Sequence, residues 1–348
     1  MKIGNFKIDN TSKTFIIAEL SANHNNDYQL AVDTIHAMKE AGADCVKLQT
    51  YTADSISMNA DTKYFAPRDS GLWKGQRPYD VFKVGSMPYE WQPKLMKLAN
   101  SLGMECFSSP FDKEAIDFLE SINTTAYKIA SFEIQDIPLI KYAASKGKPI
   151  IISTGIADLS DIELAVSACK SVGNNDIALL KCTSAYPTPF DEINIKVIPN
   201  LKEKFGTIVG LSDHTMGSVV PMGAVSLGAK IIEKHFVLKR SNGGVDAAFS
   251  MEPDEFKQMV DNVRNLELAL GRVTYELTDK QKDSKTRGTS LFICKDVKKG
   301  DKITSENIKA VRPGVGLHPK HYEEVVNKTF NIDLVKGTPL SFEHISRD

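Results

Sequence analysis

The sequence predicts an α/β fold: a (β/α)8 barrel, the TIM-barrel architecture, followed by a small β-rich domain. Short β-branched runs alternate with amphipathic stretches, the pattern of parallel strands joined by crossover helices. Eight such units fit within about 250 residues, the usual size of this barrel. An open doubly wound sheet is the alternative, but no G-x-G-x-x-G run follows the first expected strand.

The barrel elements are expected in strict alternation. Eight apolar runs are expected as strands, at residues 15–19, 44–49, 104–108, 126–130, 149–153, 177–182, 208–212 and 230–236. Amphipathic spacing predicts helices at residues 28–41, 88–102, 113–122, 138–146, 160–172, 191–204, 217–227 and 252–270.

Two regions depart from this alternation. Residues 52–85 are polar and rich in Gly, Pro and aromatic residues, and we expect a long functional loop over the catalytic face of the barrel. Beyond the barrel domain, residues 1–276, the charged segment 277–285 is expected as a linker. Residues 286–348 are expected as the small domain, with strand-like runs at 291–294, 309–311 and 338–341. A domain of that size is only marginally stable alone, so we expect it to pack on another surface.

Composition narrows the class of protein. The chain is 42% hydrophobic and 25% charged, which excludes a disordered or low-complexity protein. With 43 basic and 44 acidic residues it carries a net charge of −1, so we expect no nucleic-acid partner. No apolar run is long enough for a membrane span, and the first residues lack the apolar stretch of a signal peptide, so we expect neither. Five cysteines without a C-x-x-C motif are typical of free thiols in a reducing cytoplasm.

Polar residues gather where the expected strands end. In a (β/α)8 barrel the active site forms at the carboxyl ends of the strands, and buried charges there are costly without a purpose. Seven of the eight expected strands, counted generously, deliver a charged or histidine side chain within a few residues of their end. We therefore expect an active site at this end of the barrel.

His214 and His235 are the sharpest pair, because they end consecutive strands. Neighbouring strands lie about 4.8 Å apart, so two imidazoles at matching heights can share one divalent metal. Glu233 lies two residues before His235 and shares its face of the strand. Such N and O donors suit Mn, Fe, Co or Zn. Two alternatives to a metal site remain: a pair of core histidines with satisfied hydrogen bonds, or one histidine that acts as a general base.

Lys47 and Lys128 also stand at strand ends, near Ser109, Ser131 and Ser153. Two ammonium groups with hydroxyls and backbone N–H groups make a site for a small dianion such as phosphate or carboxylate. Schiff-base catalysis by one lysine, as in a class I aldolase, is the competing functional interpretation. A purely structural interpretation is a lysine that pairs with a carboxylate of the barrel.

Taken together, these motifs resemble the sialic acid synthase family, the nonulosonic acid synthases. The resemblance spans nearly the whole chain, in order, through IAELSANH at 17–24, VKLQT at 46–50, FSSPF at 107–111, KIAS at 128–131, STG at 153–155, YPT at 186–188, GLSDH at 210–214 and IEKHF at 232–236. VRPG at 311–314 and GLHP at 316–319 resemble the family's antifreeze-like (SAF) domain. ELSANH at 19–24, GLW at 71–73 and SFE at 131–133 are most similar to the pseudaminic acid synthase branch.

The resemblance implies a metal-dependent condensation. Phosphoenolpyruvate (PEP), water and an amino-sugar aldehyde, in this branch 2,4-diacetamido-2,4,6-trideoxy-L-altrose, would give a nonulosonic acid and phosphate. It implies a divalent metal on His214 and His235, with Mn²⁺ as the first choice and Co²⁺ or Mg²⁺ as alternatives. Synthesis of N-acetylneuraminate or legionaminate is the rival within the family, and a Schiff-base aldolase is the rival of another class.

The resemblance also implies roles for individual residues. Glu19, Glu233 and Lys47 would be catalytic, and Asn23, Tyr186 and Arg312 would bind the sugar. Arg312 would reach from the small domain of a partner subunit, which implies a domain-swapped homodimer. Ser184 replaces an Asn of the sialic acid synthases, which puts a neuraminate product in doubt. The expected contacts to PEP are Lys47, Ser109, Lys128, Ser131, Ser153, Ser184 and Ser212.

Overall fold

The computed structural model describes residues 1–346 and divides the chain into two compact units, Met1–Gly271 and a second unit that begins at Arg272. Eight parallel strands of the first unit close into a barrel in the order β10-β3-β4-β5-β6-β7-β8-β9. Pairing of β10 with β3 closes the barrel, with His235 opposite Glu19. The predicted (β/α)8 barrel is therefore confirmed. Among the described residues, no helix has both the length and the apolar character needed to cross a membrane.

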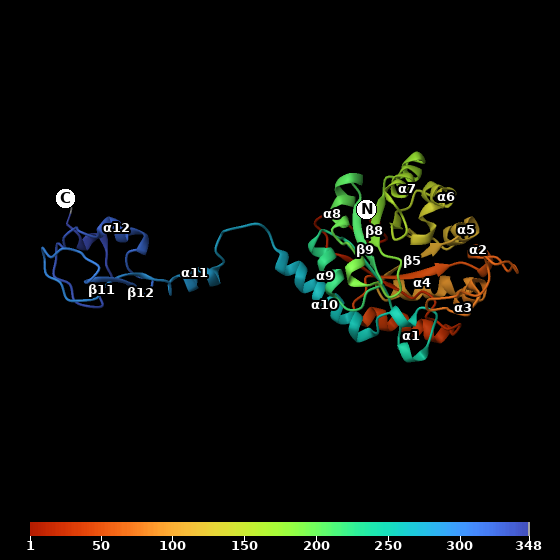
Figure 1. The fold of residues 1–348 in the computed structure, drawn as a ribbon, viewed down its shortest axis with the longest axis horizontal. Coiled ribbons are helices and arrows are strands. Elements are labelled where there is room, and N and C mark those ends of the chain that lie inside the picture. Colours follow the sequence, from red (N-terminus) through yellow and green to blue (C-terminus); the bar gives the residue numbers. More distant parts are fainter. Residues whose placement is uncertain (347–348) are drawn as a thin grey trace. The chain divides into compact units, whose positions relative to one another are not determined.

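All eight expected barrel strands are present, and helices surround them (Figure 1). The strands are β3 (Phe15–Glu19), β4 (Cys45–Thr50), β5 (Glu105–Pro110), β6 (Tyr127–Ile129), β7 (Ile150–Ser153), β8 (Ile177–Cys182), β9 (Ile208–Asp213) and β10 (Ile231–His235). The helices at the expected positions are α1 (Tyr28–Glu40), α4 (Gln92–Ser101), α5 (Lys113–Ser121), α6 (Ile137–Ser145), α7 (Leu159–Ser171), α8 (Val197–Phe205), α9 (Val219–Ser226) and α10 (Pro253–Leu270).

Several elements differ from the expectation. Residues 52–85 contain two short helices, α2 (Ala53–Ile56) and α3 (Pro78–Gly85), where a loop was expected. A small hairpin of β1 (Lys2–Ile3) and β2 (Phe6–Lys7) precedes the barrel and was not predicted. Its two-residue strands are too short to show an alternating pattern.

Two buried clusters follow from the alternation of side chains along the strands. Ile16, Ala18, Val46 and Leu48 pack with apolar residues of the surrounding helices. Alternate strand residues form a second cluster without helical members, which fills the barrel interior; it contains Phe15, Ile17, Cys45, Phe107, Ala126, Ile151, Ala178, Leu180 and Ile231, with Ile3 and Ile8 from the N-terminal residues. Inward positions nearer the carboxyl ends of the strands are therefore the ones left for polar side chains.

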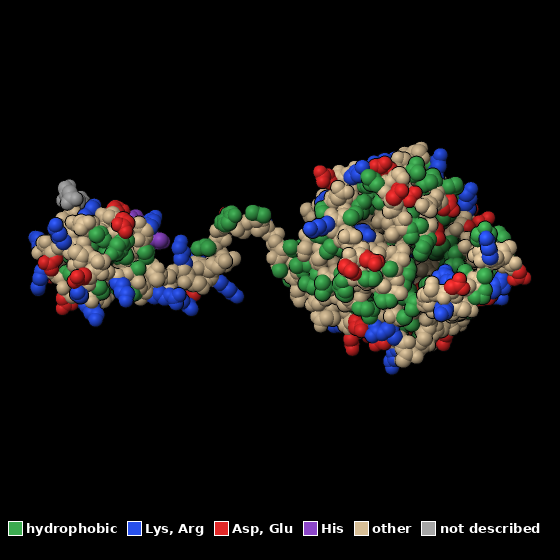
Figure 2. Space-filling model, in the orientation of Figure 1, with side chains coloured by type: hydrophobic (Ala, Val, Ile, Leu, Met, Phe, Trp, Pro, Cys, Tyr) green, Lys and Arg blue, Asp and Glu red, His purple; other side chains and the backbone are tan. Residues whose placement is uncertain are grey.

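The second unit is built around one antiparallel pair, β11 (Ser290–Ile293) with β12 (Ile308–Val311). A core of Leu291, Ile303 and Phe330, among others, packs beside it together with the short helix α12 (Tyr322–Val325). The expected linker holds a helix, α11 (Asp279–Lys285). Residues 338–341 form an isolated bridge instead of a strand, since Pro339 has no N–H to donate to a ladder. Acidic and basic side chains both occur on each unit in the face drawn in Figure 2.

Candidate active site

The carboxyl ends of the strands surround a cavity of about 570 Å³. Eleven of the residues predicted for the site line this one cavity: Glu19, Lys47, Lys128, Ser131, Ser153, Ser184, Tyr186, Ser212, His214, Glu233 and His235. Strand alternation explains the convergence. Glu19 continues the inward series of Phe15 and Ile17, and Lys47 follows Cys45 two residues later.

A buried network of charges occupies the centre of the cavity. Lys47 Nζ lies 2.7 Å from Glu19 Oε1 and 3.1 Å from Glu233 Oε1. The three side chains are at most 3% exposed, so each charge depends on the others for its stability. Burial opposes both charged forms, but the pairing outweighs it: the pKa of Glu19 is held below its usual range, and the pKa of Lys47 is raised. Lys47 is therefore a fixed ammonium group.

Lys128 stands on the other side of Glu233. Its Nζ donates a hydrogen bond of 2.7 Å to Ser153 Oγ and lies 3.4 Å from Glu233 Oε1. Ser212 Oγ donates to the same carboxylate oxygen at 3.2 Å. Burial lowers the pKa of Lys128, and the Glu233 carboxylate offsets part of that effect. Glu233 Oε2 is buried and has no hydrogen-bond partner among the described residues, so one oxygen of this carboxylate is left for a ligand.

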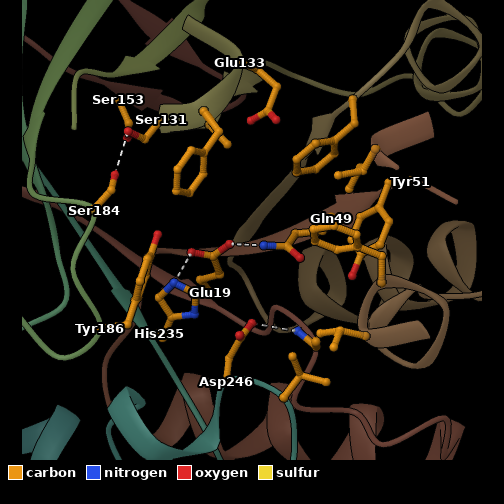
Figure 3. Close-up of a pocket in the computed structure, with 18 of the residues that line it drawn as sticks. Glu19, Gln49, Tyr51, Ser131, Glu133, Ser153, Ser184, Tyr186, His235 and Asp246 are labelled. Carbon is orange, nitrogen blue, oxygen red and sulfur yellow. Dashed lines mark hydrogen bonds and ion pairs between the residues drawn. The ribbon is translucent and has the colours of Figure 1, made fainter. Parts of the chain in front are cut away.

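Ser131 and Ser184 meet beside this network. Ser184 Oγ donates to Ser131 Oγ at 2.8 Å, and Ser131 Oγ accepts from the Ile156 amide at 3.1 Å (Figure 3). Gly155 makes the meeting possible, since a Cβ there would lie 2.3 Å from Ser184 Oγ and 2.5 Å from Ser131 Oγ. Small residues thus bring hydroxyl and backbone N–H groups together, as binding a phosphate or carboxylate requires.

The two imidazoles are neighbours, with ring centroids 5.3 Å apart. His235 Nε2 lies 3.1 Å from Glu19 Oε2, and His214 Nδ1 lies 3.1 Å from the Thr183 carbonyl. His235 Nδ1 is buried and has no partner among the described residues. Burial lowers the pKa of His235, which favours the neutral imidazole that binds metals.

These donors fit a divalent cation. Within residues 1–346, no group of three or more His, Cys, Asp or Glu side chains has the geometry of a metal site, so the protein would supply the two imidazoles. Water or substrate oxygens would complete the coordination, as is usual for cations that keep open positions. The unpartnered His235 Nδ1 and the adjacent Glu19 carboxylate are consistent with such an ion.

Three predicted site residues lie elsewhere. Asn23 is buried beside the cavity but does not line it, since its Nδ2 donates to the Phe236 carbonyl and to Ser250 Oγ. Ser109 lies behind the lining, 3.5 Å from Lys47 Nζ. Arg312 follows β12 in the second unit, where its side chain is exposed.

The cavity also contains side chains that the sequence did not single out. Asp246 lies in the segment after β10, where it accepts hydrogen bonds from Ser21 Oγ and from the Ala22 amide, the latter at 3.5 Å. Glu133 follows β6, and burial raises the pKa of its carboxyl to about 7. Asp246 and Glu133 both lie in the segment after a barrel strand, and this position was the signal in the sequence that could have identified them as site residues. Residues 52–85, which were expected over this face, add aromatic side chains to the lining, including Trp73.

Comparison with known proteins follows the same division of the chain. A model of the NeuB family matches residues 34–275, and a model of the SAF domain matches residues 288–346. The chain is 46% identical over 340 residues to a pseudaminic acid synthase of Campylobacter jejuni, covering 98% of each chain. It is 37% identical over 350 residues to an N,N'-diacetyllegionaminic acid synthase of Legionella pneumophila, covering 99% of this chain and 98% of the relative.

A solved structure shares the architecture. N-acetylneuraminic acid synthetase of Leptospira borgpetersenii, crystallised in complex with citrate, superposes with a TM-score of 0.72 at 31% identity. The match covers 82% of this chain and 94% of the other. The barrel, its site and the extent of these matches lead to one assignment: the chain belongs to the NeuB family and carries a C-terminal SAF domain.

Proposed function

We propose that this protein is a pseudaminic acid synthase, which condenses PEP with 2,4-diacetamido-2,4,6-trideoxy-L-altrose and water to give pseudaminic acid and phosphate. The observation that carries the proposal is the convergence of two lysines, several hydroxyls and an imidazole pair in one cavity. The 46% identity to a pseudaminic acid synthase supports the choice of sugar, against 37% for a legionaminic acid synthase.

PEP would bind where the cationic and hydroxyl groups converge. Lys47 and Lys128 supply positive charge, while Ser131, Ser153 and Ser184 supply donors of hydrogen bonds to its phosphate and carboxylate. The charges of the two lysines are already balanced by Glu19 and Glu233. Binding a multiply charged anion therefore calls for a further cation, which is one reason to expect a divalent metal at the imidazole pair.

We propose different tasks for the two glutamates, because their contacts differ. C3 of PEP attacks the aldehyde carbon and forms the new C–C bond, which leaves positive charge at C2. Glu19 is held as a carboxylate by Lys47, Gln49 and His235, so it stabilises that charge. Water then adds to C2, and Glu233 accepts its proton at the unpartnered Oε2. Cleavage of the C–O bond of the tetrahedral intermediate releases phosphate.

His214 and His235 would hold the divalent metal, Mn²⁺ by preference, whose chemistry is to polarise the aldehyde oxygen. The residues around it orient the aldehyde. Tyr186 lies against His214, with ring centroids 4.4 Å apart, and lines the cavity on the same side. We propose that its ring packs on the sugar chain next to the reacting carbon.

We further propose a domain-swapped homodimer in which Arg312 of the partner subunit binds an acetamido group of the sugar. Arg312 is exposed in the second unit, as such a role requires. Mixing an Arg312→Ala variant with a Lys128→Ala variant should restore part of the activity that each has lost, because the hybrid dimer has one intact site. Activity that stays at the level of the separate variants contradicts the swap.

One assay tests the reaction. The full-length protein is incubated with PEP, Mn²⁺ and one of three sugars: the diacetamido-trideoxy-altrose, its legionaminate-pathway counterpart, or N-acetylmannosamine. Phosphate release and a nonulosonic acid with the altrose sugar are expected, with much lower rates for the other two. Release only with N-acetylmannosamine would replace the proposal with a neuraminate synthase.

A Schiff-base aldolase is disfavoured by the charge network. A lysine nucleophile must lose its proton, whereas pairing with Glu19 and Glu233 raises the pKa of Lys47. Lys128, whose pKa burial lowers, is the lysine to examine. Borohydride trapping of a covalent adduct at Lys128, with full activity in EDTA, would favour the aldolase.

A further inference from the structure

The cavity has two chemically different halves. The strand ends form a polar floor of charged and hydroxyl groups. The same cavity has an apolar wall, by which we mean Tyr51, Phe65, Trp73, Val81, Phe82 and Phe111. Four of these six residues belong to the segment 52–85. In Figure 3, Ser131, Ser153 and Ser184 lie at the upper left, Tyr51 lies at the right, and Glu19 lies between them.

The wall is held in place by contacts with the barrel. Trp73 Nε1 donates a hydrogen bond of 3.3 Å to the Val245 carbonyl, in the segment after β10. The Tyr51 ring meets Phe82 and Phe111 edge-on, with centroids 6.3 and 5.2 Å apart. Gly85, which ends α3, packs so closely that a Cβ there would lie 2.7 Å from Tyr51 Oη. The apolar surface is therefore preformed.

Two polar groups near the wall, Asp246 and Gln49, are engaged with protein partners. Asp246 accepts hydrogen bonds from Ser21 and Ala22, and Gln49 donates to Glu19 Oε1 at 2.9 Å. The Arg68 guanidinium stacks on the Trp73 ring, 4.9 Å from its centroid. Glu133 keeps one buried oxygen without a partner among the described residues, enough for a single N–H of an acetamido group. A sugar end rich in hydroxyls would find few partners here.

The proposed reaction fixes which end of the sugar meets the wall. The aldehyde carbon must lie beside PEP and the imidazole pair, on the polar floor. The rest of the open chain then extends away from the floor, and carbon 6 is the atom farthest from the aldehyde. Because wall and floor line one cavity, the distal end of the sugar lies against the wall.

We propose that the apolar wall, with Trp73 at its anchored edge, selects a sugar whose carbon 6 is a methyl group and rejects the counterpart with a hydroxyl there. This inference rests on the proposed function. A hydroxyl packed on the apolar ring faces of the wall loses its water without a matched hydrogen bond there, whereas a methyl group loses nothing. An apolar pocket rejects one added hydroxyl by a factor of about 10².

The test compares two sugars that differ in one atom. The full-length protein with PEP and Mn²⁺ is assayed for phosphate release with 2,4-diacetamido-2,4,6-trideoxy-L-altrose and with its 6-hydroxy counterpart. We expect kcat/KM to favour the 6-deoxy sugar by about 10²-fold. Trp73→Ala should reduce that ratio by about tenfold and leave the KM for PEP nearly unchanged, because PEP binds on the floor. Trp73→Phe keeps an apolar ring and should retain most of the ratio.

Val84→Ala is the matched control, since Val84 is an exposed apolar residue of the same segment and does not line the cavity. If Trp73→Ala does not fold, Phe65→Ala takes its place. Equal use of both sugars by the unmodified protein, or an unchanged ratio in the folded wall variants, would overturn the inference alone. No phosphate release with either sugar would overturn the proposed function, and this inference with it.

Discussion

The polar floor and the apolar wall of the cavity are built in opposite ways. Floor residues such as Lys47, Lys128 and Glu233 sit on barrel strands and are 1–2% exposed, so strand register sets their positions and mutual pairing sustains their charges. Wall residues such as Trp73 come mainly from a connection between a strand and its helix and are half-buried. In the proposed function, the strands carry the groups that need exact placement for chemistry, and the connection carries the residues that we propose to select the sugar.

The largest effect is expected from the imidazole pair. The double variant His214→Ala/His235→Ala should lose Mn²⁺ binding in calorimetry and reduce kcat/KM by more than about 10³-fold, because both protein ligands are gone. His36→Ala, on the exposed face of α1, is the control and should bind and react normally. Undiminished Mn²⁺ binding by the double variant would show that the metal lies elsewhere.

Lys128 tests the anion-binding side of the floor. Lys128→Met keeps the length of the side chain and removes its charge, so kcat/KM for PEP should fall by about 10²-fold, the usual cost of one preorganised contact. Steady-state kinetics with PEP as the varied substrate measures the loss. Lys170→Met changes an exposed lysine of α7 and should be silent. Unchanged PEP kinetics in Lys128→Met would remove this residue from the PEP site.

A variant of Asn23 distinguishes two roles for this residue, structural support of the site and direct contact with the sugar. Asn23→Ala leaves the Phe236 carbonyl and Ser250 Oγ without their donor, which should lower the free energy of unfolding by about 2 kcal/mol. Urea unfolding measures this, with Asn100→Ala, at an exposed position of α4, as control. Unaltered stability together with a raised KM for the sugar would instead support the role that the family resemblance implied.

Glu133, at the boundary between floor and wall, should give the smallest effect, as a pH dependence of stability. Its pKa in the folded protein is about 7, above the ordinary 4.5, because burial disfavours the carboxylate. The folded state therefore holds its proton more tightly, and stability should fall as pH rises from about 4.5 to about 7. Glu133→Gln should remove roughly 1 to 2 kcal/mol of that fall between pH 5 and pH 7.

Denaturant unfolding at the two pH values measures the difference for Glu133→Gln. The control is Glu114→Gln, at an exposed glutamate in the first turn of α5, which should leave the pH dependence as it is. A Glu133→Gln variant with the same pH dependence as the unmodified protein would show that this carboxyl ionises as if it were in water.

The differences from the expected elements have local causes. Pro78 at the first turn of α3 and the capping box of Thr52 with Ser55 are helix-start signals within residues 52–85. Thr278 and Gln281 form another capping box at the start of α11, in the expected linker. The polar composition of these segments instead led to the prediction of a loop and a linker. The helices α2, α3 and α11 span at most about two turns, which is too short for a repeating amphipathic pattern.

The alternation of strand and helix patterns was enough to predict the barrel and the polar floor. Alternation along each strand is a local property, so Glu19, Lys47 and His235 were placed at the same end of the barrel without knowledge of any long-range contact. The tertiary structure was needed to show that Asn23 forms hydrogen bonds beside the cavity without lining it, and which aromatic residues of 52–85, Trp73 among them, form the lining. Trp73 is bound to Val245, 172 residues away in the chain, and a contact across that separation leaves no periodic trace in the sequence.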